Sequence, residues 1–188
     1  NWFTNLNNTA GYIYIIRDPR DVAISWSKHA NLSYDESISF MLNFNSCIEW
    51  AQTNSELPDN IKPKTFLSSW DEHVLSWTEN NLDVPKLVLK YEDLVYKKEE
   101  TIKIIVKFFE KNFKIKFNSN NEIITNIVES TSFEKLKTQE SKYGFAEASS
   151  GAFFRRGEKN QWKNELNIEQ IARLENKFRD FINKFSYD

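Results

Sequence analysis

Two short apolar runs and several longer stretches with helical spacing make up the hydrophobic pattern of the chain. Residues 11–16 form a β-branched and aromatic run that stops at Asp18-Pro19, which predicts a buried strand. Residues 86–91 form a similar run after Pro85 and predict a second strand. Two strands among many helices indicate an α/β fold with part of its sheet missing.

Start signals locate the helices that separate these strands. Asp18 is a favourable N-cap and Pro19 suits a first turn, so a helix is expected from there to about Ala30. Ser33 and Glu36 have the form of a capping box that opens a second helix. Apolar side chains at helical spacing mark the second helix and four more: Ile38, Met41, Leu42 and Phe44; Phe66, Trp70, Val74 and Trp77, in a helix that begins at Ser69; Ile102, Ile105, Val106 and Phe109; Ile123, Ile124, Ile127 and Val128; Ile171, Leu174, Phe178, Phe181 and Phe185.

Two segments lack a regular pattern. Residues 53–64 contain two prolines and are expected to form a loop. Between Gln139 and Trp162 the helical spacing stops and three of the chain's four glycines occur, which predicts a long loop. Long loops in compact domains often carry function. No repeat or linker divides the chain, so residues 1–188 are expected to form one domain.

Composition narrows the class of protein. Hydrophobic residues make up 40% and aromatic residues 15% of the 188 positions, which is typical of a folded chain rather than a disordered one. The net charge of −2 argues against a general affinity for nucleic acid or anionic membranes, so any anion site has to be local. No stretch approaches the length of about 20 apolar residues that spans a bilayer.

Cysteine and histidine content limits the chemistry further. Cys47 is the single cysteine, so no disulfide forms within the chain, and a reducing, cytoplasmic location is expected. One cysteine and two isolated histidines also make a metal site unexpected. The sequence starts at Asn1 without a methionine or a signal pattern, which we interpret as a start within a longer protein.

Residues 17–25 form the first candidate site. A helix N-terminus at the carboxyl end of a strand presents N–H groups and the positive end of a dipole to an anion, at the edge where open α/β sheets bind ligands. Arg17 can donate two hydrogen bonds to a phosphate, and the hydroxyl of Ser25 lies two helical turns further on. The alternative is that Arg17 pairs with Asp18 or Asp21 at the surface.

The long loop carries the second candidate site. Arg155 and Arg156 are adjacent, and Gly157 permits a close approach of the backbone, so this segment could close over an anion. An ordinary solvated, charged loop is the alternative. Together with residues 17–25, the loop predicts a phosphorylated ligand that is held from two sides.

Four segments follow one another along the chain: Tyr14 to Ser25, Lys90-Tyr91-Glu92-Asp93-Leu94, Thr131-Ser132-Phe133-Glu134-Lys135-Leu136, and the arginine loop from Arg155 to Lys163. In this order they resemble the motifs of the sulfotransferase family that uses 3′-phosphoadenosine 5′-phosphosulfate (PAPS), and the first resembles its 3′-phosphate motif. Two features depart from the family pattern: Asn160-Gln161 replaces Gly-Asp, and Ala172 stands where the dimer segment of cytosolic members has Glu, so the oligomeric state stays open.

The resemblance implies the sulfotransferase fold, a P-loop-like parallel sheet flanked by helices, here partial and rich in helix. It implies transfer of a sulfuryl group from PAPS to a hydroxyl or amine of a small-molecule or carbohydrate acceptor, with no metal, nucleic acid or membrane as partner. The implied cofactor-binding residues are Arg17, Ser25, Arg155, Arg156 and Gly157 around the 3′-phosphate, and Tyr91, Thr131 and Phe133 around the adenine.

The catalytic part of the family pattern does not occur before Arg17. Family members carry a Gly/Ser/Thr-rich loop for the 5′-phosphosulfate and then a His or acidic base. We therefore expect both upstream of Asn1, an N-terminally truncated domain and an inactive 188-residue chain. His29 and His73 fit packing or surface roles better than that of the base.

Two other functions remain open. One is a non-catalytic nucleotide-binding or scaffold module. The other is a P-loop kinase-like phosphotransferase, for which the chain offers no Gly-x-x-x-x-Gly-Lys-Ser/Thr loop.

Overall fold

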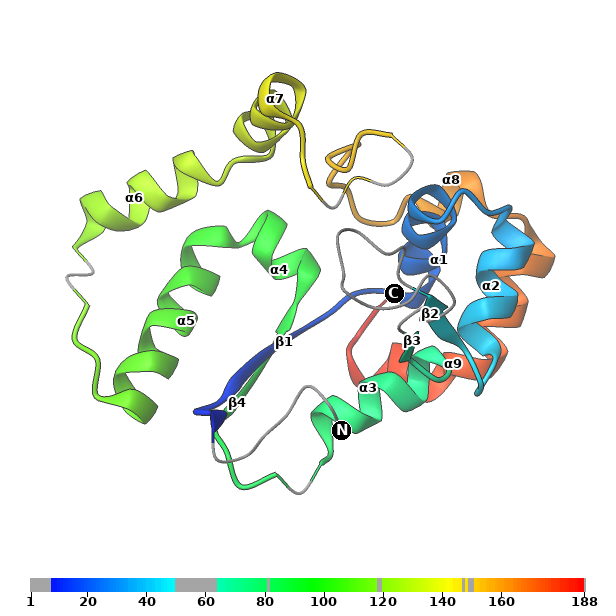
Figure 1. Ribbon diagram of the computed structural model, residues 1–188, viewed down its shortest axis with the longest axis horizontal. Helices are drawn as coiled ribbons and strands as arrows, with labels where there is room; N and C mark the ends of the chain where they lie inside the picture. Colours follow the sequence, from blue (N-terminus) through cyan, green and yellow to red (C-terminus); the bar gives the residue numbers. More distant parts are fainter. Residues whose placement is uncertain are drawn as a thin grey trace, which may run out of the picture.

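A pair of parallel strands lies at the centre of the computed structural model (Figure 1). β1 (Tyr12–Ile16) and β4 (Lys86–Lys90) pair along their whole length. Both predicted strands are confirmed, and the chain is a helix-rich α/β protein with a small parallel sheet. The residues that the structure describes are 8–49, 64–80, 82–117, 120–146, 148 and 151–187.

Helices make up most of the described chain, and the predicted start signals are confirmed. The carboxylate of Asp18 accepts a hydrogen bond from the backbone N–H of Arg20, and Ser33 forms a capping box with Glu36. The helices are α1 (Pro19–His29), α2 (Tyr34–Leu42), α3 (Trp70–Thr78), α4 (Tyr91–Tyr96), α5 (Lys98–Phe113), α6 (Asn121–Ser130), α7 (Phe133–Tyr143), α8 (Trp162–Glu165) and α9 (Ile168–Lys184).

The largest hydrophobic core lies between α1, α2 and α9. Leu174 and Phe178 are four residues apart, so they share one face of α9, and both are fully buried. They pack with Ile24 of α1 and Ile38 of α2. The ring of Phe178 also lies 5.1 Å from that of Trp70, measured between centroids, which ties α3 to the same core.

A short antiparallel hairpin replaces part of the predicted helical pattern. β2 (Cys47–Glu49) pairs with β3 (Lys64–Phe66), and neither strand was predicted. The expectation that Phe44 and Phe66 lie on buried helix faces is wrong: they are 60% and 62% exposed, and their ring centroids lie 6.3 Å apart. The spacing of single apolar residues cannot distinguish such a hairpin from a helix. Most of the predicted loop 53–64 lies outside the described residues.

The long loop is shorter than the sequence indicated. α7 continues to Tyr143, past the predicted loop start at Gln139. This helix has no buried residue, and its sequence is polar from Lys137 to Lys142, so no apolar spacing marks its second half. It ends where the N–H of Gly144 bonds to the carbonyl of Glu140, with Gly144 at a φ of +75°.

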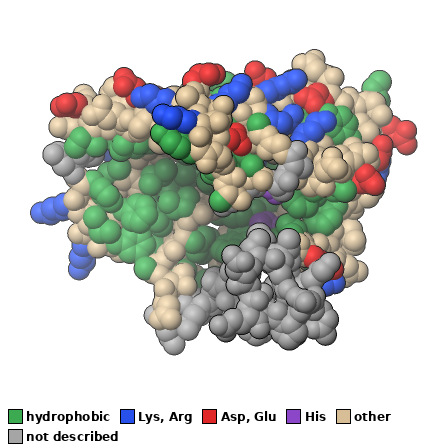
Figure 2. Space-filling view, turned by 45° about the horizontal axis from the view of Figure 1, so that its top comes forward, with side chains coloured by type: hydrophobic (Ala, Val, Ile, Leu, Met, Phe, Trp, Pro, Cys, Tyr) green, Lys and Arg blue, Asp and Glu red, His purple; other side chains and the backbone are tan. Residues whose placement is uncertain are grey.

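The two strands separate the helices into two groups (Figure 1). α4 to α7 form an arc on one side, and α1, α2, α8 and α9 lie on the other. The loop that follows α7 returns to α8 beside α1. Acidic and basic side chains are interspersed on the face drawn in Figure 2, as expected from the low net charge. No described helix has the length and hydropathy of a membrane span.

Candidate functional site

Arg17 lies where three segments of the chain meet. It follows β1 directly, and its guanidinium carbon lies 4.4 Å from the ring centroid of Tyr91, the first residue of α4. Its Nη2 donates a hydrogen bond to the carbonyl of Glu158 in the arginine loop, over 3.1 Å. The same Nη2 lies 3.9 Å from a carboxylate oxygen of Asp21, so the ion pair weighed as an alternative is present. The side chain is only 16% exposed.

The helix start next to Arg17 is less open to an anion than the sequence indicated. The carboxylate of Asp18 already accepts the amide of Arg20, so this N–H is not free for a ligand. Asp18 also binds the guanidinium of Arg20 through both oxygens, at 3.0 and 2.8 Å. Nε of Arg17, in contrast, is buried and has no hydrogen-bond partner among the described residues. Buried donors are normally paired, so Arg17 is the group that suits an anion here.

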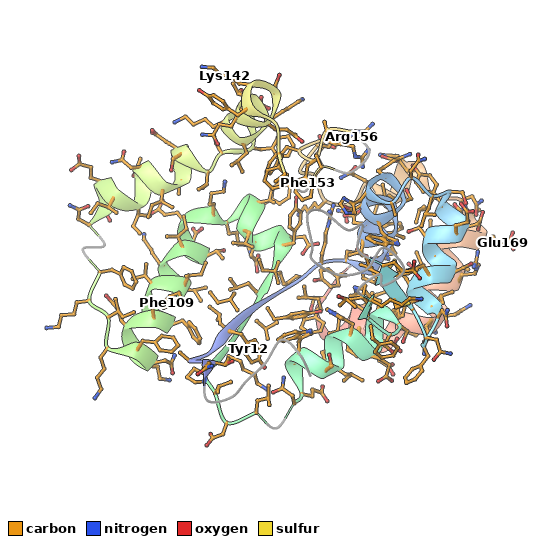
Figure 3. All side chains as sticks on the ribbon, in the orientation of Figure 1. Tyr12, Phe109, Lys142, Phe153, Arg156 and Glu169 are labelled. Carbon is orange, nitrogen blue, oxygen red and sulfur yellow. The ribbon has the colours of Figure 1, made fainter. Side chains whose placement is uncertain are left out.

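The arginine loop, extended here to residues 151–163, is fixed to three helices through its backbone N–H groups. Asp21 of α1 accepts hydrogen bonds from the amides of Asn160 and Trp162, at 2.8 and 3.1 Å. Glu140 of α7 accepts from the amides of Phe153 and Phe154. The hydroxyl of Tyr96 in α4 accepts from the amide of Lys159 at 3.1 Å. The described part of the predicted loop therefore connects the two groups of helices (Figure 3).

Arg156 is held by a carboxylate in this structure. Its Nη1 lies 3.0 Å from Glu165, which also accepts a hydrogen bond from the hydroxyl of Tyr34. Burial and the bond to Glu165 raise the pKa of Tyr34 to about 12, while the charges of Arg155 and Arg156 oppose that rise. Arg156 is 55% exposed and lies on the outer side of the loop (Figure 3). The charges of both arginines thus act on Tyr34, and the two residues directly precede Gly157 in the loop.

Gly157 approaches an aromatic ring rather than open space. Its φ is +65°, and a Cβ built there would lie 2.5 Å from the ring of Phe133. The ring of Phe133 also lies 6.2 Å from that of Phe154, measured between centroids. The glycine therefore allows the loop to pack onto the start of α7. The face of Phe133 that was expected to meet an adenine is partly taken by this contact.

The remaining predicted residues lie at the edge of this region. Ser25 is exposed on α1, and Thr131 is exposed at the end of α6. The hydroxyl of Thr131 donates to the carbonyl of Ile127, and its own carbonyl accepts from Lys98 at 2.6 Å. The structure thus brings Arg17, Tyr91, Gly157 and Phe133 together through direct contacts around the loop. Ser25 and Thr131 flank this group on adjoining segments.

Both histidines pack against aromatic rings. Nδ1 of His73 lies 3.1 Å from the hydroxyl of Tyr14, and burial lowers the pKa of the imidazole. The ring of His29 lies 6.3 Å from that of Phe153, measured between centroids. These surroundings agree with the packing role expected from the sequence. The described residues contain no group of three His, Cys, Asp or Glu side chains suited to a metal ion.

Two carboxylates of this region were not among the predicted site residues. Asp21 is 1% exposed, and it appeared in the sequence only as a surface partner for Arg17. Glu92 accepts a hydrogen bond from the amide of Asp18 at 3.2 Å, and burial raises its pKa. Both carboxylates lie next to predicted site residues, Asp21 near Arg17 and Glu92 beside Tyr91, but their hydrogen-bond partners lie far away in sequence.

Comparison with known proteins matches nearly the whole chain. A family model for the sulfotransferase domain covers residues 4–186. Rabbit (Oryctolagus cuniculus) amine sulfotransferase is 28% identical over 195 residues, covering 97% of this chain and 59% of the rabbit protein. Dog (Canis lupus familiaris) sulfotransferase 1B1 is 28% identical over 175 residues, covering 89% and 53%. The chain thus spans about half the length of the curated relatives it matches.

Solved structures show the same fold. The crystal structure of mouse sulfotransferase SULT7A1 complexed with PAP superposes with a TM-score of 0.63 at 23% identity, over 89% of this chain and 57% of that chain. Retinol dehydratase in complex with androsterone and the inactive cofactor PAP also gives 0.63 at 23% identity, over 90% and 46%. The predicted fold class is therefore confirmed.

Proposed function

The chain belongs to the sulfotransferase family, and we propose that the whole protein transfers a sulfuryl group from PAPS to a hydroxyl or amine of a small-molecule or carbohydrate acceptor. The observation that carries this proposal is the position of Arg17. Its guanidinium lies between the end of β1, α4 and the arginine loop, with a buried Nε that has no partner among the described residues. A phosphate oxygen would satisfy this donor.

We propose that the 3′-phosphate of PAPS binds between α1 and the arginine loop. Arg17 would donate to it from the inner side, and Ser25 from the surface of α1. Arg155, Arg156 and the backbone at Gly157 would close over it. The bond between Arg156 and Glu165 is exposed, so the exchange of this carboxylate for a phosphate costs little.

The adenine would lie between Tyr91, Thr131 and Phe133. One face of Tyr91 is covered by Arg17, and part of Phe133 is covered by Gly157. The base would therefore meet the remaining surfaces of these rings. This arrangement supports recognition of the nucleotide end that is remote from the reacting sulfur, which positions the sulfuryl group for transfer.

The reaction forms a bond from the acceptor oxygen or nitrogen to sulfur. At the same time the bond from sulfur to the bridging oxygen of the 5′-phosphate breaks, and 3′-phosphoadenosine 5′-phosphate (PAP) leaves. The acceptor's proton passes to a base. We assign no residue of this chain to that base, and we propose that the 188 residues alone do not turn over. With a single cysteine, the chain fits the cytoplasmic location that we propose.

Calorimetric titration of the complete protein with PAP and with AMP, which lacks the 3′-phosphate, tests this function. We expect PAP to bind much more tightly. Arg17→Ala should weaken PAP binding by about 2–4 kcal/mol, because charge-assisted bonds to a desolvated anion are lost. Arg17→Lys keeps the charge but loses the planar guanidinium, so its affinity for PAP should lie between those of the unmodified protein and Arg17→Ala. Equal affinity for PAP and AMP in the unmodified protein would contradict the proposed 3′-phosphate site.

A further inference from the structure

Asp21 connects the two sides of the proposed phosphate site. Its side chain is 0% exposed, on the first turn of α1. One carboxylate oxygen accepts the amide of Asn160, and the other accepts the amide of Trp162. The first of these oxygens also lies 3.9 Å from Nη2 of Arg17. A single buried carboxylate therefore contacts both the inner arginine and the loop.

The other tethers of the loop do not make this connection. Glu140 holds Phe153 and Phe154 from α7, and Tyr96 holds Lys159 from α4. Among the described residues, neither Glu140 nor Tyr96 forms a hydrogen bond or ion pair with Arg17. In the described part of the chain, Asp21 is thus the tether that contacts Arg17 as well.

The carboxylate of Asp21 is kept at a buried position. Burial raises the pKa of its carboxyl, although the amides of Trp162 and Asn160 and the charge of Arg17 act in the opposite direction. These three partners offset the cost of burying the charge, and they belong to both sides of the proposed site.

We propose that Asp21 is a positioning residue that sets the distance between Arg17 and the arginine loop, so that both reach the same 3′-phosphate. This inference rests on the proposed function. Arg17 donates to the carbonyl of Glu158 in the loop and also pairs with Asp21. Asp21 in turn accepts the amide of Asn160, two residues further along the loop. These bonds close a small ring that fixes the loop before the ligand arrives, which lowers the ordering cost of binding.

Asp21→Asn tests the proposal because it keeps the shape but replaces one of the two acceptors by an NH₂ group. We expect faster tryptic cleavage in the loop, after Arg155, Arg156 or Lys159, without any ligand. We also expect PAP affinity to fall roughly 10- to 100-fold, the range for losing a hydrogen bond to a charged group. AMP affinity should stay unchanged, because AMP has no 3′-phosphate.

Glu175→Gln is the matched control. Glu175 of α9 pairs at 2.6 Å with Arg20, which precedes Asp21 in the first turn of α1. Among the described residues Glu175 has no hydrogen bond to the loop. Loop cleavage and PAP affinity should both stay within about twofold of the unmodified protein. A loss of PAP affinity equal to that of Asp21→Asn would overturn the proposal, since any damage to α1 would then suffice.

Other results also decide the question. Unchanged loop cleavage in Asp21→Asn would overturn its role as a tether. Faster cleavage with unchanged PAP affinity would show that Asp21 holds the loop without affecting phosphate binding, which would overturn its role as a positioning residue. Equal losses for PAP and AMP would reduce Asp21 to a folding residue. If the proposed function itself is wrong, the unmodified protein will bind PAP and AMP with equal affinity, which is a separate result from any effect of Asp21→Asn.

A loop variant keeps the test valid if Asp21→Asn does not fold. One glycine inserted between Glu158 and Lys159 leaves Asp21 and its two amide donors intact, but breaks the spacing between the bond to Arg17 and the bond to Asn160. We expect the same selective loss of PAP affinity. An unchanged preference for PAP over AMP would contradict the proposed distance setting.

Discussion

At the scale of single residues, Gly157 meets two separate demands. Its φ of +65° is a left-handed conformation that residues with a side chain adopt at a cost. A Cβ would also overlap the ring of Phe133, because the two would be 2.5 Å apart. The second demand comes from the contact between the arginine loop and α7.

Gly144 provides the comparison that separates these demands. Its φ is +75°, yet nothing lies within 4 Å of a Cβ built there. Gly144→Ala should lower the free energy of unfolding by about 1–2 kcal/mol through backbone strain alone. Gly157→Ala should cost more and also speed proteolysis of the loop, as measured by urea unfolding and limited trypsin digestion. Equal costs in the two variants would mean that the ring of Phe133 moves aside freely.

At the scale of elements, α9 contributes the largest buried ring of the core. Phe178 is fully buried, so Phe178→Ala should lower the free energy of unfolding by about 3–5 kcal/mol, from lost burial and the remaining cavity. Ile168 lies on the same helix and is 88% exposed. Ile168→Ala should change stability by less than about 0.5 kcal/mol in the same urea titrations. A small effect of Phe178→Ala would contradict the assignment of this core.

The packing of α3 on β1 should depend on pH. Burial lowers the pKa of His73 at its contact with Tyr14, so the folded state resists protonation of the imidazole. The unfolded chain takes up that proton near the ordinary pKa of about 6.5, so stability should fall as pH drops through this value. The slope for one proton is at most about 1.4 kcal/mol per pH unit. His73→Gln should remove this part of the slope, measured by urea unfolding at pH 8 and at pH 6. An unchanged slope would show that His73 stays solvated.

The sequence predicted those elements whose signals are local. β1, α1 and α2 carry their stop and start residues within a few positions, so Asp18, Pro19 and Ser33 located them. The hairpin β2–β3 depends on pairing between distant segments, and the polar second half of α7, from Lys137 to Lys142, gives no apolar period. The stability of a strand pair such as β2–β3 depends on contacts across the sheet, and the neighbouring residues in the sequence do not reveal it.

At the scale of the whole molecule, the candidate site was predicted only in part. The order of the motifs pointed to Arg17 and to the arginine loop, and the structure places them 3.1 Å apart, from Nη2 to the carbonyl of Glu158. The role of Asp21 could not be predicted, because its amide partners lie 139 and 141 residues further along the chain. An acidic residue beside an arginine looks like a surface pair until the fold shows what else it binds.

The buried guanidinium of Arg20 has a consequence for the biosynthesis of the protein. Its last partner, the carbonyl of Tyr187, comes 167 residues later in the chain. On a ribosome, the turn that contains Arg17 and Arg20 would emerge long before that carbonyl is made. In the meantime Arg20 has Asp18 beside it, two residues away. Contacts of such high sequence separation close late in folding. The turn should therefore reach its final, desolvated form only after translation has passed Tyr187, so ligand binding at this turn should depend on a segment that is made 167 residues later.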